Sequence, residues 1–262
     1  MPAVLALLDR PAAMAALRRG LSRGRSRLVA CRSPAALEPI LQQRWVEAVV
    51  LGTQQLQRTA LASFRERFPA IPLISYGALR ADDADLLLSC HRLGMAAILV
   101  EGVDDPVVGD LVTRHTATAA RRRGLADAPK LLRLTEAIQL AAWELLVQVP
   151  GANHQTAELA DQLGCSREHL SRQFGAGGAP NLKRVVNFLR VVAAAELAAN
   201  PGYDRHAVAR LTGFSSAGHL QTVCLQTAGV SLATLVGERT ETVLGYIQRA
   251  ELFRNHAAEG LL

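Results

Sequence analysis

Hydrophobic and polar positions follow two different patterns along the chain. In residues 1–124, short continuous apolar runs alternate with stretches of helical spacing. The apolar runs predict strands at residues 4–8, 27–31, 46–51, 71–75 and 96–100. The intervening stretches predict helices at residues 11–21, 34–44, 59–68, 82–93 and 106–123. Continuous apolar strands that are each followed by a helix indicate a parallel sheet covered on both faces. We therefore predict an α/β flavodoxin-like domain for residues 1–124.

Local signals support these helix starts. Ser33 is a typical N-cap residue, and Pro34 stands at the first helical position. Asp82, Asp83 and Asp85 fall in the first turn of the helix expected at 82–93, where the helix dipole favours acidic side chains.

Beyond the stretch 124–129, which holds Gly, Asp and Pro, only helical spacing is found. A helix over residues 130–149 is expected to pack through one apolar face, made of Leu131, Leu134, Ile138, Ala141, Leu145 and Val149. It is too short for a persuasive coiled coil, so we interpret it as the first helix of the next domain rather than a dimerisation zipper. The predicted organisation is residues 1–124, a connecting region 125–155, an all-α domain 156–236 and a C-terminal helix 237–262 for packing or self-association.

Residues 156–174 have the pattern of two short helices joined by a glycine turn. Thr156 could cap the first helix, Gly164 supplies the turn, and Ser166 caps the second helix. The apolar positions are Leu159, Ala160, Leu163, Leu170 and Phe174. The outer face of the second helix is then polar, with Arg167, Glu168, Ser171 and Arg172. This pattern predicts a helix-turn-helix whose second helix has dimensions that fit a DNA major groove.

A second copy of the pattern lies at residues 207–224. It repeats the small residue at Ala209, the turn glycine at Gly213, a cap at Ser215 and the apolar pair Leu220 and Cys224. A long helix at 181–199 is expected between the copies, with a buried side made of Leu182, Val185, Val186, Leu189, Val192, Ala193 and Leu197.

Two helix-turn-helix units joined by a long helix resemble the AraC/XylS family of transcriptional regulators. The residues that carry the resemblance are Ala160 to Gly164, Leu170 to Phe174, Arg190 with Ala194, Gly213 to Ser215, and Gly229 to Ser231. The resemblance covers about residues 135–236. It implies a module that places two helices in successive major grooves on one face of double-stranded DNA.

The chain departs from this family mainly in the second unit. Arg172 keeps the family's arginine in the first unit, but Thr222 stands at the equivalent position of the second. Leu225 replaces a usual lysine and Leu232 a usual proline, and residues 215–225 contain no Lys or Arg. We therefore expect the first unit to supply most of the affinity and base readout.

The residues predicted to contact DNA are Arg167, Glu168, Ser171, Arg172, Lys183, Arg184, Ser216, His219, Gln221 and Thr222. Arg190 has two interpretations, a phosphate contact or an internal ion pair with Glu196 or another acid.

Residues 3–123 resemble a response-regulator receiver domain in length and in the alternation of strands and helices. The family uses an acidic pair after the first strand, a phosphoacceptor Asp after the third and a Lys-Pro after the fifth. Here Asp9 alone matches the acidic pair, Gly52 stands at the phosphoacceptor position, and Glu101-Gly102 replaces Lys-Pro. The resemblance therefore implies a receiver-like domain that is not phosphorylated on aspartate. We expect a scaffold for dimerisation or partner docking, with a small-molecule sensor as the alternative.

Composition changes this picture little. Half of the residues are hydrophobic and 20% are charged, which is typical of a globular protein. The net charge of +6 resides in residues 1–124, which hold 17 Arg and 11 acidic residues, whereas residues 125–262 hold 12 basic and 12 acidic residues. Charge alone therefore does not point to nucleic acid, since the region expected to bind DNA is neutral.

The remaining chemistry is sparse. The histidines and the four scattered cysteines show no metal-ligand spacing, and we predict no metal, no cofactor and no enzymatic activity. The glycine-rich stretch 175–179 follows a helix and lacks a Gly-Lys-Ser/Thr ending, so it is interpreted as an inter-helix turn rather than a phosphate loop. Without a secretory signal or a long apolar run, we expect a cytoplasmic protein with no membrane partner.

These patterns lead to one main expectation and two alternatives. The main expectation is a sequence-specific, DNA-binding transcriptional regulator, independent of phosphorylation. It would form a homodimer, and a small-molecule or protein effector on the N-terminal domain is a further partner to consider. The first alternative is a protein-interaction adaptor whose helix-turn-helix module no longer binds DNA specifically. The second is an enzyme built on the flavodoxin-like half, which would require a bound nucleotide or flavin.

Overall fold

The computed structural model describes residues 2–22, 26–56, 59–80, 82–148, 156–174 and 178–259. The chain folds into two compact units. Unit 1 comprises Met1–Ala120 with Asn200–Gly202, and unit 2 comprises Arg121–Ala199 with Tyr203–Leu262. None of the helices within the described ranges is long and apolar enough to span a membrane.

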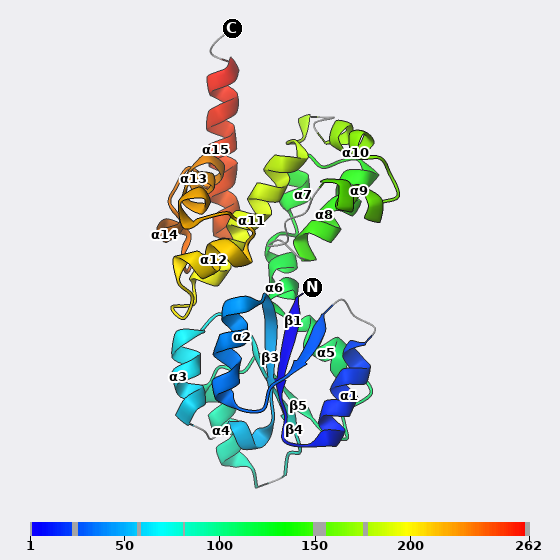
Figure 1. Cartoon of the computed structure of the whole chain (residues 1–262), viewed down its shortest axis with the longest axis vertical. Coiled ribbons are helices and arrows are strands. Elements are labelled where there is room, and N and C mark those ends of the chain that lie inside the picture. Colours follow the sequence, from blue (N-terminus) through cyan, green and yellow to red (C-terminus); the bar gives the residue numbers. More distant parts are fainter. Residues whose placement is uncertain are drawn as a thin grey trace. The chain divides into compact units, whose positions relative to one another are not determined.

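Unit 1 contains a 5-stranded, fully parallel sheet with strand order β2-β1-β3-β4-β5 (Figure 1). The strands are β1 (Ala3–Leu7), β2 (Arg27–Ala30), β3 (Val46–Leu51), β4 (Leu73–Gly77) and β5 (Ala97–Val100). The helices are α1 (Pro11–Leu21), α2 (Leu37–Gln43), α3 (Thr59–Arg67), α4 (Ala84–Arg92) and α5 (Val108–Arg114), with short 3-10 helices η1 (Pro34–Ala36) and η2 (Thr53–Gln55). Helix α6 (Ala117–Gly124) begins in unit 1 and ends in unit 2. This strand order is that of the flavodoxin-like fold, so the predicted fold class is confirmed.

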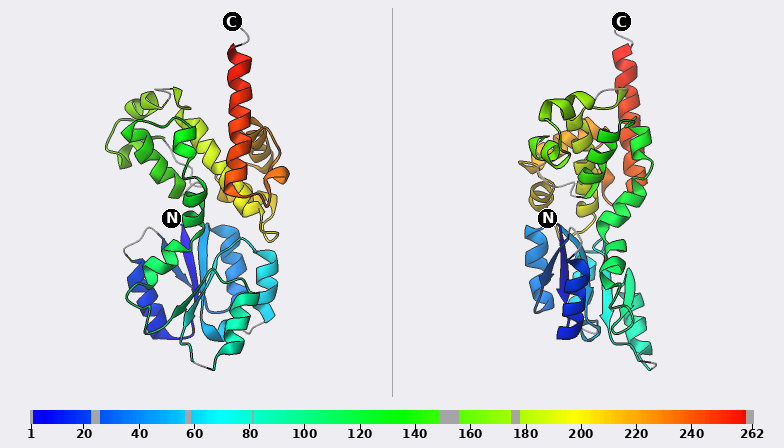
Figure 2. Two further views of the ribbon diagram at one scale, coloured as in Figure 1. Left: turned by 180° about the vertical axis from the view of Figure 1, so that it is seen from behind. Right: turned by 90° about the vertical axis from the view of Figure 1, so that its right-hand side faces the viewer.

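Alternate strand residues serve the two faces of this sheet, because successive side chains of a strand point in opposite directions. Val4, Ala6, Ala48, Val50, Ile74 and Tyr76 share one buried cluster with residues of α1 and α5. Helices α2, α3 and α4 cover the other face, and Figure 2 shows the sheet with helices on both sides. The central strands β1, β3 and β4 are therefore buried on both faces, whereas the edge strands β2 and β5 are partly exposed.

Helices α1 and α5 approach each other at a pair of glycines. A Cβ atom on Gly20 would lie 2.7 Å from the backbone N of Gly109, closer than Cβ atoms approach other atoms in real proteins. Both positions therefore have to be glycine for the backbones to meet this closely. This close approach was not predicted from the sequence.

The single helix predicted at 106–123 is wrong, because the structure divides it into α5 and α6. Thr116 lies at the break, where its Oγ1 donates to the Thr113 carbonyl oxygen and accepts from the Ala119 amide. These side-chain bonds compete with the helical backbone ladder and end α5.

Two predicted helix starts differ from the structure in detail. Ser33 does occupy the N-cap position ahead of Pro34, but its side chain makes no capping hydrogen bond and the first turn is 3-10. Helix α4 begins at Ala84, so Asp83 precedes the helix, where its carboxylate accepts from the Arg80 amide at 2.7 Å.

Every regular element that the structure describes in unit 2 is a helix. The helices are α7 (Ala128–Leu131), α8 (Ala137–Gln148), α9 (Thr156–Gln162), α10 (Arg167–Gln173), α11 (Leu182–Ala198), α12 (Arg205–Leu211), α13 (Ala217–Ala228), α14 (Leu232–Leu235) and α15 (Thr240–Glu259). The all-α class predicted for this half is confirmed. The predicted helix end at Pro150-Gly151 and most of the glycine-rich stretch, residues 175–177, lie outside the described residues.

The single helix predicted at 130–149 is also wrong. Arg133 has a left-handed backbone with φ of 53°, which separates α7 from α8. The helical register starts afresh at Ala137, so the predicted apolar face does not form: Leu131 and Ala141 are exposed. The buried residues of α8 are instead Gln139, Ala142, Trp143, Leu146 and Val147.

The long helix predicted at 181–199 is confirmed as α11, which Asn181 caps by accepting from the Arg184 amide at 3.0 Å. Most of its predicted apolar side is buried, although Val186 is only half-buried. Helix α15 realises the predicted C-terminal helix and buries Val243, Leu244 and Ile247 in unit 2.

Candidate functional site

Helices α9 and α10 form the first helix-turn-helix. Gly164 turns the chain with φ of 65°, and Ser166 Oγ caps α10 by accepting from the His169 amide at 3.1 Å. Ala160, Leu170 and Phe174 are buried at the crossing of the two helices. The predicted turn, cap and most of the core are therefore confirmed, although Leu163 is only half-buried. Thr156, expected as a cap, is instead the first residue of α9.

Helices α12 and α13 form the second unit with the same geometry. Gly213 has φ of 75°, and the Phe214 amide donates to the Ala209 carbonyl oxygen at 2.8 Å. The predicted cap at Ser215 is wrong by one residue, because Ser216 Oγ accepts from the His219 amide at 3.0 Å. Ser215 instead places its Oγ 3.0 Å from Nδ1 of His219.

Arg190 of α11 is part of the core of this second unit rather than of a DNA surface. Its Nε donates to the Thr212 carbonyl oxygen at 2.8 Å, and its guanidinium carbon lies 3.8 Å from the centre of the Phe214 ring. Burial lowers the pKa of Arg190. The guanidinium thus holds α11 to the α12–α13 turn by a hydrogen bond and a cation–π contact.

Glu196, the other end of the predicted internal pair, binds Arg121 instead. Both Nε and Nη2 of Arg121 donate to Glu196 Oε2, at 2.9 and 2.6 Å. The Arg121 side chain is completely buried and also donates to the Val147 carbonyl oxygen. Arg121 therefore links α6 to α8 and α11 through hydrogen bonds that were not predicted from the sequence, although Glu196 itself is partly exposed.

The buried side chain of Gln139 is hydrogen-bonded to the first helix-turn-helix. Gln139 Oε1 accepts from the amides of Thr135 and Glu136 at 2.9 and 3.1 Å, which caps α8. Its Nε2 donates to the Gln173 carbonyl oxygen at the last residue of α10, at 2.8 Å. One side chain therefore ties the start of α8 to the end of α10.

Most residues predicted to contact DNA are exposed. They are Arg167, Glu168, Ser171 and Arg172 on α10, Lys183 and Arg184 at the start of α11, and Ser216, His219 and Thr222 around α13. Gln221 does not project to solvent in this way, because it is half-buried and its Oε1 accepts from the Leu232 amide at 3.4 Å.

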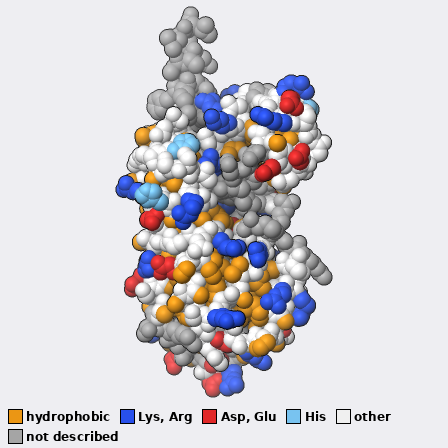
Figure 3. Space-filling view, viewed as in Figure 1, with side chains coloured by type: hydrophobic (Ala, Val, Ile, Leu, Met, Phe, Trp, Pro, Cys, Tyr) orange, Lys and Arg blue, Asp and Glu red, His pale blue; other side chains and the backbone are white. Residues whose placement is uncertain are grey.

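The two second helices present different chemistry. Helix α10 exposes Arg167 and Arg172, and Nη2 of Arg172 lies 3.4 Å from His169 Nδ1. Helix α13 has no Lys or Arg, and its Leu225 is 51% exposed. Basic and acidic side chains are interspersed on the face of unit 2 seen in Figure 3. Of the two second helices, only α10 therefore offers positive charge to DNA, beside Lys183 and Arg184 at the start of α11.

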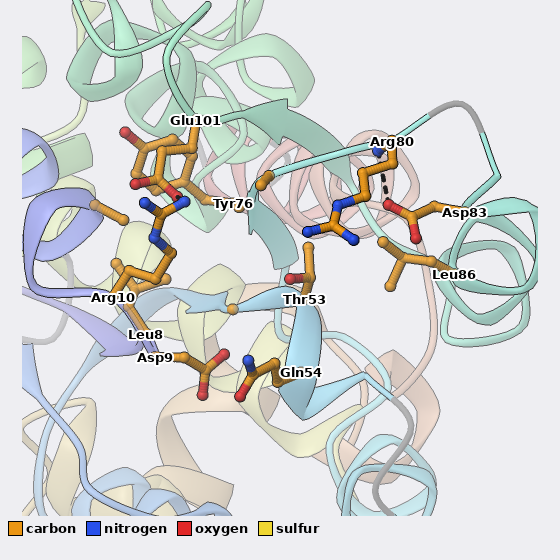
Figure 4. Close-up of a pocket in the computed structure, with 14 residues that line it drawn as sticks. Leu8, Asp9, Arg10, Thr53, Gln54, Tyr76, Arg80, Asp83, Leu86 and Glu101 are labelled. Carbon is orange, nitrogen blue, oxygen red and sulfur yellow. Dashed lines mark hydrogen bonds and ion pairs between the residues drawn. The ribbon is translucent and has the colours of Figure 1, made fainter.

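The receiver-like positions of unit 1 meet in one pocket of about 430 Å³ at the carboxyl ends of the strands (Figure 4). Asp9 follows β1, Gly52 follows β3 and Glu101 follows β5, and all three line this pocket. The structure thus brings together the residues that the receiver resemblance singled out. Arg10, Thr53 and Arg80 also line it and were missed; their positions just after β1, β3 and β4 are the signal that could have found them.

Gly52 and Gly77 line this pocket, and the side chains of Asp9 and Thr53 lie directly against them. A Cβ atom on Gly52 would overlap the carboxylate of Asp9, which also accepts a hydrogen bond from Gln55 Nε2. A Cβ atom on Gly77 would lie 2.8 Å from Cγ2 of Thr53. The space beside β3 and β4 is therefore taken by Asp9 and Thr53.

The charges around the pocket differ from the receiver pattern. Arg10 follows Asp9, and its Nη1 lies 3.1 Å from Oε2 of Glu101. The position after the fifth strand is thus acidic and already paired, with only 9% of the Glu101 side chain exposed. Among the residues that the structure describes, no three His, Cys, Asp or Glu side chains are grouped as a metal site.

All four cysteines are unpaired with one another. Cys224 lies in the core of the second helix-turn-helix, and burial raises its pKa to about 12. Cys224 therefore acts as a small apolar side chain in that core.

No protein-family model and no curated protein sequence matches the chain. Solved structures of response regulators resemble its fold. The signal receiver domain of an HD domain-containing protein from Pseudomonas fluorescens Pf-5 is 19% identical, covers 44% of this chain and 85% of its own, and has a TM-score of 0.38. The RcsB response regulator of Salmonella typhimurium is 18% identical, covers 72% and 98%, and has a TM-score of 0.35. Full-length FixJ from B. japonicum is 13% identical, covers 85% and 95%, and also has a TM-score of 0.35. At these identities the likeness is one of fold.

Proposed function

We propose that this protein is a DNA-binding transcriptional regulator of the AraC/XylS type. The observation that carries the proposal is the geometry of unit 2. Two helix-turn-helix units, α9–α10 and α12–α13, share a left-handed glycine turn and a serine-capped second helix, and α11 joins them. Helix α10 exposes Arg167 and Arg172 and buries Leu170. An exposed, capped helix bearing arginines is the arrangement that reads base edges in a major groove.

The proposal also assigns unit 1 a role that does not involve phosphorylation. It is supported by Gly52, where a side chain would overlap Asp9, and by Glu101, where a basic residue would be needed to pair with a phosphoryl group. Unit 1 would instead dimerise the protein or sense an effector, and so set the spacing of two DNA modules. We propose a binding protein rather than an enzyme.

The test is DNA binding by the full-length protein. Genomic fragments would be selected on immobilised protein, and the affinity for the enriched sequence would be measured by fluorescence anisotropy over a series of salt concentrations. We expect a specific affinity at least about 10³-fold above that for scrambled DNA, and a linear fall of log affinity with log salt. Failure to enrich any sequence, with only weak and sequence-independent binding, would contradict the proposal.

A second candidate function follows from α13. This helix has no basic residue and exposes Leu225, so the second unit carries its basic side chains, Arg205 and Arg210, on α12 and none on the helix expected to enter a groove. A module of this kind suits an adaptor that contacts protein. A protein partner captured by unit 2, together with a flat salt dependence on DNA, would favour the adaptor over the regulator.

A further inference from the structure

The pocket of unit 1 holds three carboxylates, and each is already engaged. Asp9 accepts from Gln55 Nε2, and Glu101 pairs with Arg10 at 3.1 Å. Asp83 accepts from the Arg80 amide at 2.7 Å. The acidic groups of the lining are therefore neutralised or hydrogen-bonded within the protein itself.

Arg80 is different. Its guanidinium belongs to the pocket lining, yet among the described residues it makes no ion pair or side-chain hydrogen bond. Figure 4 shows this guanidinium extending over the pocket in the direction of Thr53. The Thr53 hydroxyl likewise makes no hydrogen bond to a described residue. Within the described part of the chain, a cation and a hydroxyl group are thus left without a partner on the lining of one cavity.

The position of the pocket and its lining residues limit the class of ligand that it can bind. It lies at the carboxyl ends of the strands in a doubly wound sheet, the usual ligand position in such folds. Its volume of about 430 Å³ falls within the range of small-molecule sites. Leu8, Ala13 and Leu86 supply apolar walls, which suit a carbon skeleton better than an inorganic ion.

We propose that this pocket binds a small organic anion, with a phosphate or carboxylate group held by Arg80 and Thr53. The anionic group takes the guanidinium fork and the hydroxyl as donors, and the carbon skeleton lies against the apolar walls. Glu101 limits the affinity, because it occupies Arg10, the second cation of the lining. This site gives unit 1 a sensing role. The inference concerns ligand binding alone and does not depend on DNA binding by unit 2.

The test is isothermal titration calorimetry on the full-length protein with three-carbon probes. Glycerol 3-phosphate presents a phosphate, glycerate presents a carboxylate, and glycerol presents neither. We expect saturable binding of at least one anion and none of glycerol. Which anion binds decides between phosphate and carboxylate.

Two variants probe the donors and one serves as a control. Arg80→Gln should weaken binding of the anion about tenfold or more, since a charged hydrogen bond and an ion pair are lost. Thr53→Val keeps the side-chain shape and should weaken binding by a smaller factor. Arg92→Gln removes an exposed charge of α4 that does not line the pocket, and should leave the affinity unchanged.

The opposite change is expected at Glu101. Glu101→Gln releases Arg10 for the ligand and should tighten binding severalfold, whereas Glu66→Gln, an exposed position of α3, should have no effect. The inference is overturned if neither anion binds saturably, if Arg80→Gln binds as tightly as the wild type, or if Arg92→Gln weakens binding as much as Arg80→Gln. Thermal melting of each variant would establish that the fold is retained.

The affinity of the same variants for DNA would be measured separately. The proposal on anion binding by unit 1 and the proposal on DNA binding by unit 2 can therefore fail independently.

Discussion

The carboxylate of Asp9 occupies the space in which a side chain at Gly52 would begin. A Cβ atom at position 52 would lie 3.1 Å from both the carboxyl carbon and the backbone N of Asp9, with the Oδ2 atom closer still. The glycine at the phosphoacceptor position is therefore part of an arrangement that includes Asp9 and Gln55, rather than a single missing carboxylate.

Reintroducing an aspartate should consequently not restore a phosphorylation site. We expect Gly52→Asp to lower the stability of unit 1 by about 1–3 kcal/mol, the usual cost of overpacking. Neither this variant nor the wild type should form a stable acyl phosphate with acetyl phosphate and Mg²⁺. Thermal melting and intact-mass spectrometry would check both points. Gly52→Asp combined with Asp9→Ala is the control and should recover stability, while a phosphorylated wild-type unit 1 would contradict the interpretation.

The two helix-turn-helix units should contribute unequally to DNA affinity. Arg172→Ala removes an exposed guanidinium from α10 and should cost about 1–3 kcal/mol of binding to the selected sequence. Thr222→Ala should cost less, because Thr222 Oγ1 already donates to the Gly218 carbonyl oxygen at 3.1 Å. Anisotropy titrations would compare them, with Arg239→Ala, an exposed arginine before α15, as the matched control. An equal or greater loss at Thr222 would reverse the ranking.

The elements that could be predicted are those whose signal is local. The central strands β1, β3 and β4 are buried on both faces, which favours apolar runs. The ends of all five strands lie within two residues of the predicted ones. Gly164 and Ser166 predicted the first turn because a left-handed glycine and a capping hydroxyl are properties of single positions.

The features that were missed depend on distant partners. Arg121 is buried by pairing with Glu196, 75 residues further along the chain, and nothing near Arg121 indicates this. After the break at Arg133, the start of α8 is capped by Gln139, whose amide group also donates to the Gln173 carbonyl oxygen. The hydrogen bond that Gln221 Oε1 accepts from the Leu232 amide was likewise not foreseen. Arg80 and Thr53 enter the pocket only because the sheet order brings the ends of β3 and β4 side by side.

The close approach of α1 and α5 at their glycines should be sensitive to a single methyl group. Gly20→Ala would place Cβ 2.7 Å from the Gly109 backbone, which cannot move without shifting α5. We expect a loss of about 1–3 kcal/mol in the free energy of unfolding of unit 1. Gly245→Ala is the control, because a Cβ there meets nothing within 4 Å and alanine favours the helix, so stability should rise by up to about 1 kcal/mol. Denaturant titrations would measure both, and a neutral Gly20→Ala would show that the helices separate easily.

Gln139 should matter to both stability and DNA binding. Gln139→Leu leaves the Thr135 and Glu136 amides and the Gln173 carbonyl oxygen without this partner, and should lower the stability of unit 2 by about 2 kcal/mol. Because Gln173 ends α10, the affinity for DNA should fall even where the protein remains folded. Gln148→Leu serves as the control, since Gln148 is only half-buried at the end of α8. Equal melting temperatures for the Gln139→Leu variant and the wild type would show that the buried glutamine is dispensable.

Acid should weaken unit 1 partly through Asp105. Tyr76 donates its hydroxyl to Asp105 Oδ1 at 2.5 Å, and the Gly102 amide donates to the same atom at 2.8 Å. The hydrogen bond from Tyr76, followed by that from Gly102, lowers the pKa of Asp105 in the folded state. Because this pKa is lower in the folded state, the ionised carboxylate stabilises the fold fully at pH values above the pKa of an unfolded aspartate, about 3.9. The stabilisation is lost as the pH falls through the pKa of Asp105 in the folded state.

The wild type should therefore have a higher melting temperature than Asp105→Asn at about pH 6, and the difference in melting temperature should shrink by about pH 3. Asp110→Asn, which removes an exposed carboxylate from α5, is the matched control. If the gap between the wild type and Asp105→Asn is the same at both pH values, the Tyr76–Asp105 bond does not act through the ionised carboxylate.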